Sequence, residues 1–197
     1  MADERRDEAR SAETSRRTEG AGEAVGVEMP AAVATVMQVL RERFPHLDVV
    51  HKEDEWVEAR VAPDELPTVA RFLRDDARLQ FNFLSSIAAV DYVEKGFEVV
   101  YHLLSLPEGR RKLILKVTPA GDRDNPEVPT VTDIWPTANW HEREAWDLMG
   151  IRFTGHPDLR RILLREDWVG HPLRKDYQDR RPVRERQFKE DWLGRSG

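Results

Sequence analysis

Residues 141–177 concentrate the side chains that could do chemistry. This stretch holds three of the chain's six His and two of its six Trp, among many charges of both signs. The charges alternate with aromatic residues, Gly and Pro in a pattern that neither a plain helix nor a plain strand requires. We therefore expect the function of the protein to lie in this segment.

One chemistry open to this segment is metal binding. The residues that could ligate zinc, manganese or non-heme iron are His141, Glu144, Asp147, His156 and His171. His141 and Glu144 are three residues apart and could share one helix face, as Glu-x-x-His pairs do in carboxylate iron sites. The spacing is not that of the HExxH motif, because Ala145 follows Glu144, and neighbouring arginines bring positive charge. A stand-alone metal-dependent enzyme using His141, Glu144 and His156 is therefore the less favoured alternative.

Other catalytic signatures are missing from the sequence. There is no GxSxG, GxGxxG or Walker motif. The chain has no Cys, which excludes disulfides, Cys-ligated zinc, all-Cys iron–sulfur sites and thiol catalysis. No run approaches the ~20 apolar residues that span a bilayer, and the N-terminus lacks an apolar signal core. We expect a cytoplasmic chain whose contact with a membrane is made through partners.

The charge is unevenly distributed along the chain. The formal net charge of -6 results from an excess of acidic side chains before residue 141 and a small excess of basic ones after it. A nucleic-acid-binding protein would show a clear basic face, so this class is disfavoured. A mildly basic C-terminal part is compatible with an acidic protein partner.

A small globular domain precedes the segment. Pro30 fits the first turn of a helix whose apolar stripe is Val33, Val36, Met37, Leu40 and Phe44, and Pro45 ends that helix. A second helix opens at Pro63, and its inner face is Leu66, Val69, Phe72 and Leu73. Strands are expected at 47–51, 55–61, 83–91, 97–104 and 111–118.

This order of elements predicts an α+β fold, a two-layer sandwich of a mixed sheet with two helices on one face and an extended C-terminal arm. Residues 1–28 are charged, lack aromatic residues and are predicted to be a disordered tail. The globular α+β domain is expected over 29–136, with residues 119–130 as a loop. A helix and an extended partner-docking arm are expected over 137–197.

The helix at the start of the arm has recognisable ends. Asn139 and Glu142, three residues apart, are typical of a capping box for a helix at about 140–149. Gly150 is placed to close that helix in the left-handed conformation. Residues 151–197 are punctuated by Gly and Pro, so we expect them to leave the globule and to need a partner for their order.

The segment resembles a known family. Residues 142–163, EREAWDLMGIRFTGHPDLRRIL, are similar to the signature of the 30-kDa-type subunit of respiratory complex I, the bacterial NADH:quinone oxidoreductase. The similarity continues through 165–177, and more weakly over 30–118. Arg165 and Gln178 depart from the prolines expected in many relatives. The family motif and the predicted partner interface share one set of residues. They are Trp140, Glu142, Arg143, Glu144, Trp146, Asp147, Gly150, His156, Arg160, Trp168, His171, Arg174, Lys175, Asp176 and Tyr177.

The resemblance implies a structural subunit in the peripheral arm of complex I. A subunit of this kind has no catalytic centre, cofactor or metal of its own, and it braces the 49-kDa-type subunit that builds the quinone site beside iron–sulfur subunits. NADH, FMN, iron–sulfur clusters and quinone would be bound by other subunits. The chain would sit peripherally on the cytoplasmic side of the cell inner membrane. A related complex that takes electrons from hydrogen, F420 or ferredoxin is an open alternative, because other subunits set the electron input.

Two kinds of side chain are expected at the partner interface. The aromatic anchors are Trp140, Trp146 and Trp168. The arginines expected to pair with carboxylates of the partner or of the arm are Arg143, Arg160 and Arg174.

Overall fold

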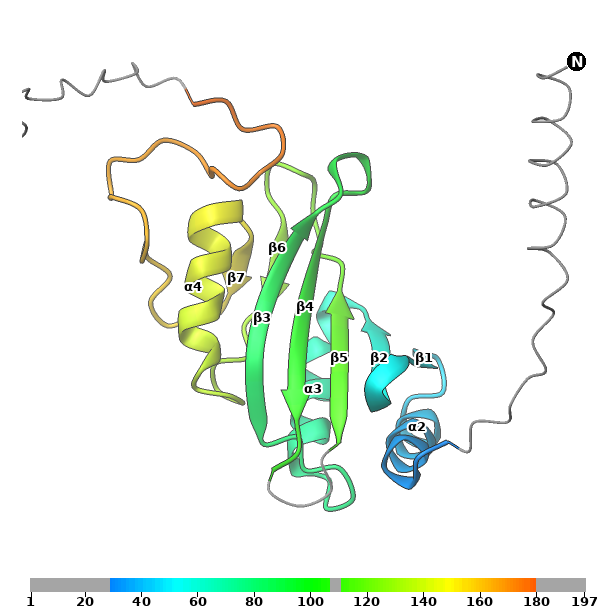
Figure 1. The fold of residues 1–197 in the computed structure, drawn as a ribbon. Coiled ribbons are helices and arrows are strands. Elements are labelled where there is room, and N and C mark those ends of the chain that lie inside the picture. Colours follow the sequence, from blue (N-terminus) through cyan, green and yellow to red (C-terminus); the bar gives the residue numbers. More distant parts are fainter. Residues whose placement is uncertain (1–28, 107–110, 180–197) are drawn as a thin grey trace, which may run out of the picture. The chain divides into compact units, whose positions relative to one another are not determined.

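The computed structural model describes residues 29–106 and 111–179. The predictions for the N-terminal tail and for the chain beyond residue 179 therefore lie outside the described residues. Within the unit that begins at Ala31, five strands form one mixed sheet in the order β1-β2-β5-β4-β3 (Figure 1). The strands are β1 (Asp48–His51), β2 (Trp56–Val61), β3 (Phe83–Asp91), β4 (Phe97–Leu104) and β5 (Lys112–Val117).

The sheet is mixed because of one pair. β2 and β5 run parallel, whereas β1 with β2, β3 with β4 and β4 with β5 are antiparallel. The hairpin of β3 and β4 closes through a short turn in which Gly96 has φ 76°, a conformation that Gly adopts without steric cost. The five strands are those expected from the alternation of apolar residues, with ends that differ by at most one residue.

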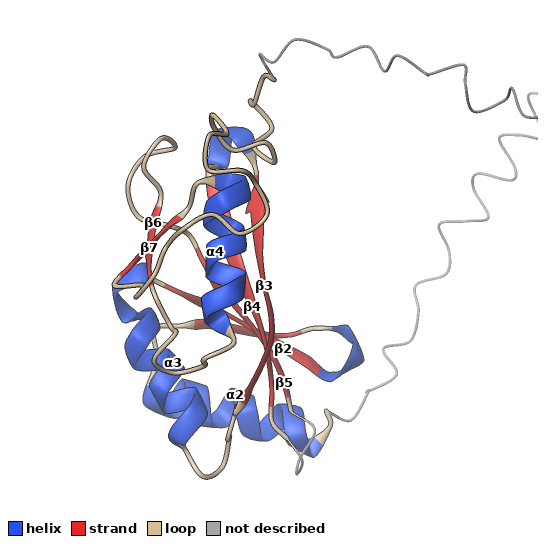
Figure 2. Cartoon of the chain, turned by 90° about the vertical axis from the view of Figure 1, so that its left-hand side faces the viewer, coloured by secondary structure: helices blue, strands red, loops and turns tan. Residues whose placement is uncertain are grey.

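Two helices cover one face of the sheet (Figure 2). They are α2 (Ala31–Arg43) and α3 (Leu66–Asp75). Their predicted apolar stripes are buried, apart from Phe72, which is partly buried against the core. The sheet contributes alternate residues to the same core, for example Val57, Leu115 and Tyr101, which are completely buried. The predicted α+β fold with two helices on one face is therefore confirmed.

Short turns of 3-10 helix connect several of these elements. They are η1 (Glu53–Glu55), η2 (Pro63–Glu65) and η3 (Val93–Lys95). In the part of the chain that the structure describes, no helix is both long and apolar enough to cross a membrane.

The boundary between globule and arm differs from the prediction. The expected loop 119–130 contains β6 (Glu127–Pro129), which pairs in parallel with β7 (Arg152–Thr154). Ile151 and Phe153, at the start of the expected arm, are buried in the core. Two three-residue strands far apart in sequence carry too little periodicity to be recognised before the tertiary structure brings them together.

Helix α4 (Ala138–Met149) packs beside β3 and carries the start of the predicted functional segment (Figure 1). The predicted capping box is wrong. Thr137 stands at the N-cap with helical angles and makes no side-chain cap, and the Glu142 carboxylate turns to a different partner. The other end agrees with the prediction, because Gly150 closes the helix with φ 74°.

Candidate functional site

Asp147 ties the arm, residues 155–179, to helix α4. Its side chain is completely buried. Oδ2 accepts hydrogen bonds from the three successive backbone N–H groups of residues 162–164, at 3.0, 2.8 and 2.9 Å. Arg161 Nη1 donates to Oδ1 at 2.6 Å. Burial alone would raise the pKa of Asp147, but these donors outweigh it and hold the pKa below its ordinary value, so the carboxylate is charged at neutral pH.

Two arginines hold the irregular backbone of the arm. Arg143 of α4 donates from Nε and Nη2 to the carbonyls of Arg160 and Arg161, both at 3.1 Å. Arg161 Nη2 donates to the carbonyls of Trp168 and Gly170 at 3.0 and 3.2 Å. A planar guanidinium with several donors can satisfy carbonyls that have no partner in a ladder. Contacts within the chain therefore join the arm to α4.

The arm also caps the C-terminal end of α4. The last three carbonyls of the helix accept, in chain order, from His171 Nδ1, the Leu173 N–H and Arg174 Nε, at 2.9, 3.0 and 2.7 Å. The carbonyls of Leu148 and Met149 would otherwise lack partners at the helix end, whereas that of Asp147 also accepts from Arg161 Nη1 at 3.2 Å. Gly150 allows this close approach, because a Cβ at that position would lie 2.5 Å from His171 Cδ2. Burial lowers the pKa of His171, which keeps the imidazole neutral.

A second set of contacts joins the end of the arm to the end of strand β3. We call this set the second clasp, and the contacts of Asp147 with the arm the first clasp. Arg123 donates from Nη1 and Nη2 to the two oxygens of Asp91, both at 2.8 Å, and from Nε to Asp176 at 2.8 Å. The Lys175 N–H donates to Asp91 Oδ2 at 2.9 Å. The Arg123 guanidinium stands 5.0 Å from the centre of the Phe97 ring. Hydrogen bonding to Arg123 holds the pKa of Asp91 well below its usual range.

Glu142 is the third buried acid of the site. Its carboxylate is completely buried and accepts from Thr130 Oγ1 at 2.6 Å and from the Val131 N–H at 2.9 Å. Burial raises the pKa of Glu142 to about 7, although the two hydrogen bonds partly oppose the rise. Tyr101 is also completely buried, and its hydroxyl has no hydrogen-bond partner among the described residues. Burial, and then the nearby Glu142 carboxylate, raise the pKa of Tyr101.

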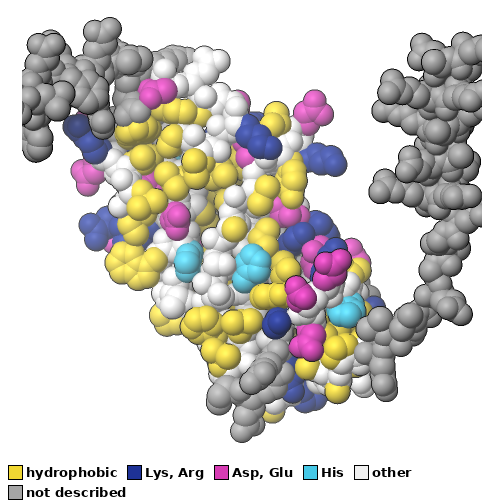
Figure 3. All heavy atoms as spheres, in the orientation of Figure 1, with side chains coloured by type: hydrophobic (Ala, Val, Ile, Leu, Met, Phe, Trp, Pro, Cys, Tyr) yellow, Lys and Arg dark blue, Asp and Glu magenta, His cyan; other side chains and the backbone are white. Residues whose placement is uncertain are grey.

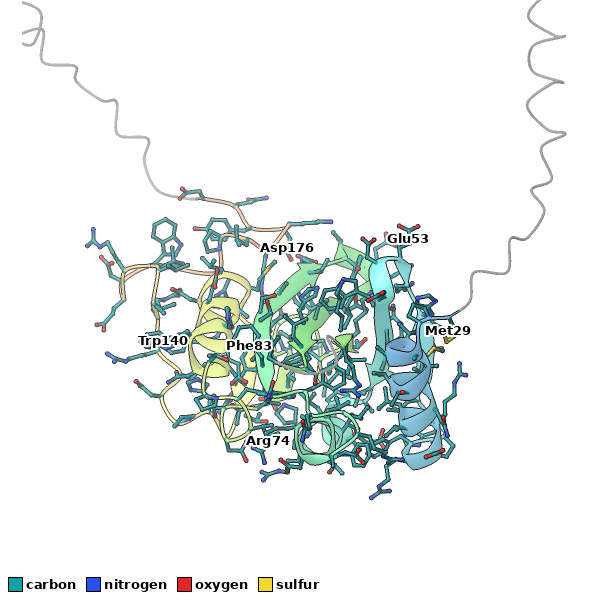
Figure 4. All side chains as sticks on the ribbon, turned by 60° about the horizontal axis from the view of Figure 1, so that its bottom comes forward. Met29, Glu53, Arg74, Phe83, Trp140 and Asp176 are labelled. Carbon is teal, nitrogen blue, oxygen red and sulfur yellow. The ribbon has the colours of Figure 1, made fainter. Side chains whose placement is uncertain are left out.

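Large apolar side chains remain exposed on α4 and the arm. Trp140 is 59% exposed, Leu163 61%, Val169 85% and Leu173 55%. Figure 4 labels Trp140 on α4 and Asp176 near the end of the arm. The arm also encloses an open hollow of about 840 Å³, with Val169 among its lining residues. Exposed apolar groups of this size on a held backbone are typical of a surface that another protein covers.

The structure separates the predicted interface side chains into three groups by burial. Those directed into the chain are Glu142, Arg143 and Asp147, which are buried and hold the arm and the loop before α4 in place. The half-buried ones are Trp146, His156, Trp168, His171, Arg174 and Tyr177. The exposed ones are Trp140, Glu144, Arg160, Lys175 and Asp176.

The sequence reasoning did not assign a role to Asp91, Arg123 or Arg161. Asp91 lies at the end of β3, within the stretch 30–118 that resembles the family more weakly, and that resemblance was a usable signal. Arg123 lies in a polar loop, and nothing in its local sequence points to Asp91, 32 residues away. Arg161 is adjacent to Arg160 and is distinguished from it only by its contacts with Asp147.

Three of the five residues considered as metal ligands, Asp147, His156 and His171, make other contacts. Among residues 29–106 and 111–179, no three His, Asp or Glu side chains are grouped as a metal ion would need. Asp147 is occupied by Arg161 and by backbone N–H groups. His171 Nδ1 is directed to a carbonyl of α4, and His156 Nδ1 accepts from the Asp158 N–H at 3.0 Å.

Comparisons with known proteins agree on one family. Residues 59–183 match the family described as respiratory-chain NADH dehydrogenase, 30 Kd subunit. The NADH-quinone oxidoreductase C subunit of Roseiflexus sp. (strain RS-1) is 51% identical over 73% of this chain and 82% of its own length. The protein of the same name from Moorella thermoacetica is 49% identical over 72% of this chain and 93% of its own length.

Solved structures show the same fold. A chain of the membrane-bound sulfane sulfur reductase, an archaeal respiratory membrane complex, has a TM-score of 0.65 at 27% identity and covers 74% of this chain and 85% of that one. The trypsin-resistant fragment of Nqo5 has a TM-score of 0.52 at 32% identity and covers 64% of this chain and 99% of the fragment.

Proposed function

The chain belongs to the family of the 30-kDa subunit of respiratory-chain NADH dehydrogenase, and we propose that it braces the quinone-site subunit of its complex without catalysing a step itself. It is a subunit of an NADH-quinone oxidoreductase, a complex I-type assembly. The quinone-site subunit is the 49-kDa-type partner, and the docking element is the outer surface of α4 and the arm.

One observation carries this proposal. The arm is held by buried charges, yet α4 and the arm leave four large apolar side chains exposed, on Trp140, Leu163, Val169 and Leu173. A rigid segment loses little conformational entropy when it binds. Most of the free energy gained by burying such side chains can therefore contribute to affinity. The open hollow beside Val169 offers space for side chains of the partner.

The structure suggests how the motif residues divide this work. Trp140 serves as an aromatic anchor, and Glu144 is exposed for charge pairing with the partner. Arg160 is exposed too, but its Nε already donates to Asp158 Oδ2 at 2.8 Å within the arm. Asp147 and Arg143 act indirectly, because they hold the backbone that carries Leu163. Loss of either buried charge would disturb the docking surface without removing a contact from it.

The electron carriers are assigned to other subunits in this proposal. NADH, FMN, the iron–sulfur clusters and quinone would be bound by partner chains, including the iron–sulfur subunits next to the quinone-site subunit. The chain would associate with the membrane peripherally, on the cytoplasmic side of the cell inner membrane.

A second candidate is the equivalent subunit of a related complex with another electron input, such as hydrogen, F420H2 or ferredoxin. The likeness to a chain of an archaeal respiratory complex with a different activity favours keeping this candidate, because the same fold serves there. Residues of this chain do not discriminate between the two, since the electron donor is bound elsewhere.

The experiment is a mild-detergent purification of the tagged full chain from its own membranes, with mass spectrometry of the proteins that co-elute. We expect the quinone-site and iron–sulfur subunits, and the identity of the input module distinguishes the two candidates. In Val169→Asp and Leu163→Asp chains, recovery of the quinone-site subunit should fall at least about tenfold, because a carboxylate replaces a central apolar contact.

The matched control is Thr68→Asp, which introduces the same charge at an exposed position of α3. It should leave recovery unchanged, and all three variants should keep the unfolding temperature of the original chain. Recovery of the unaltered chain as a lone monomer would overturn the proposal. Full recovery in both arm variants would refute the docking role of the arm.

A further inference from the structure

The sheet has a second face that no α-helix covers among the described residues (Figure 2). Strand register arranges the side chains of this open face in rows that cross β2, β5, β4 and β3. One row is Arg60, Lys116, Val100 and Ala88. The next row is Glu58, Ile114, His102 and Ser86. Figure 3 looks onto this side of the molecule, where hydrophobic and charged side chains share the surface.

Along β3 the open face presents mainly small and apolar side chains, and β4 adds Glu98 and His102 beside Val100. Ser86, Ala88 and Val90 are small side chains on β3, and Ala88 is exposed. Phe83, at the start of the same strand, is 43% exposed. Small side chains let a docked backbone approach closely, and an exposed aromatic ring at the margin offers it an anchor.

The charged side chains of the open face lie on β2, on β5 and, with Glu98, on β4, and their carboxylates are more deeply buried than their cations. The carboxylates of Glu58 and Glu98 are only 8% exposed. Arg60 donates to Glu98 at 2.7 Å and Lys116 lies 3.0 Å from Glu58, while their side chains are 50% and 20% exposed. The carboxylates therefore lie close to the sheet and the cations lie nearer the solvent, so the charge that these strands present to the solvent is positive.

We propose that the open face binds an amphipathic helix of another protein, with an apolar stripe seated over β3 and β4 and carboxylates facing Arg60 and Lys116. A helix is the element that packs on a sheet face, as α2 and α3 do on the opposite side. The small side chains around Ala88 match the close approach of such a helix. The acidic flank follows from charge complementarity with the outward cations.

A second copy of this chain is a poor occupant. A second copy would offer Arg60 and Lys116 no exposed carboxylate from β2 or β5, because the Glu58 side chain is only 8% exposed and already lies beside these cations. A partner that supplies carboxylates has no such shortage. The inference does not depend on the docking of the arm, because no residue of the open face belongs to α4 or to residues 155–179.

The test changes Ala88 in the tagged full chain, purified with its complex from native membranes. Ala88→Glu and Ala88→Lys have side chains of similar size and opposite charge. Ala34→Glu and Ala34→Lys, at an exposed position of α2, are the matched controls. A photo-crosslinking amino acid at position 88, and separately at position 163 in the arm, identifies the peptide that each surface contacts.

We expect Ala88→Glu to lower recovery of the contacting subunit at least tenfold, and Ala88→Lys to lower it by a smaller factor. The Ala34 variants should match the original chain, and all four variants should keep its unfolding temperature. The position-88 crosslink should map to a helical, acidic segment of another subunit. A crosslink to a second copy, no crosslink at 88 when 163 is captured, or a larger loss for Lys than for Glu would overturn the inference. Failure at 163 with capture at 88 would refute the arm proposal alone.

Discussion

Replacing Glu142 by Gln should remove a pH dependence of stability that this one carboxyl group causes. Burial raises the pKa of Glu142 from 4.5 to about 7 in the folded chain. The folded state therefore binds the proton more tightly than the unfolded state does. The stabilising contribution of the protonated form is complete below about pH 4.5 and is lost progressively as the pH rises to about 7.

The size of the effect follows from the pKa difference. A shift of about 2.5 units at about 1.4 kcal/mol per unit corresponds to about 3 kcal/mol in the free energy of unfolding. About 2.5 kcal/mol of that amount falls between pH 5 and pH 8. The amide of the Glu142→Gln variant keeps an oxygen that can accept from the Val131 N–H, so the variant should fold and should lack this loss.

The assay is urea unfolding of the purified chain and its Glu142→Gln variant at several values between pH 5 and pH 8. The stability of the variant minus that of the original chain should increase by about 2.5 kcal/mol over this range. Burial lowers the pKa of His102, His156 and His171, which gives the opposite slope at the acid end, but this contribution cancels in the difference. The exposed Glu144→Gln change is the control. A difference that stays constant with pH for Glu142→Gln would refute the reasoning.

Three further predictions concern the clasps that hold the arm. Asp147→Asn should make the amides of residues 162–164 exchange with deuterium at least about tenfold faster, because a buried charge that they share is removed; unchanged exchange would contradict this. Arg123→Gln should speed native-state trypsin cleavage within the arm, since the second clasp is broken; an unaltered rate would argue against the clasp. Gly150→Ala should destabilise the chain more than Gly96→Ala does, because both have positive φ but only Gly150 has crowded neighbours; equal losses of about 1 kcal/mol in unfolding experiments would dispute the crowding.

Local patterns were sufficient to predict most of the fold. The strands at 83–91 and 97–104 were expected with the bounds that the structure has, because alternation of apolar residues reports which face is buried. The first helix was predicted by its apolar stripe and by the prolines that flank it. Gly150 was predicted as a helix terminus because a left-handed position after a helix strongly favours Gly.

The candidate site was predicted by position but not by role. The segment 141–177 was recognised from its mixture of charges, aromatic residues and Gly, and its similarity to the 30-kDa subunit family is confirmed by the family match. Glu142 was predicted to take part in a capping box, yet its carboxylate accepts a hydrogen bond from the Val131 N–H. Asp147 was expected at the partner interface with the rest of the family motif, yet it is completely buried within the chain.

What the sequence determined by itself is therefore the five strands of the main sheet, the helices and the family to which the chain belongs, but not β6 and β7. These depend on residues close together in the chain, where periodicity and turn chemistry act directly. Which charges are buried, and against what, was decided only by the tertiary structure. Asp91 pairs with Arg123, and Asp147 pairs with Arg161, because separate segments of the chain converge in the fold. A buried charge can hold a structure together only if its partner is buried with it and offsets the loss of hydration.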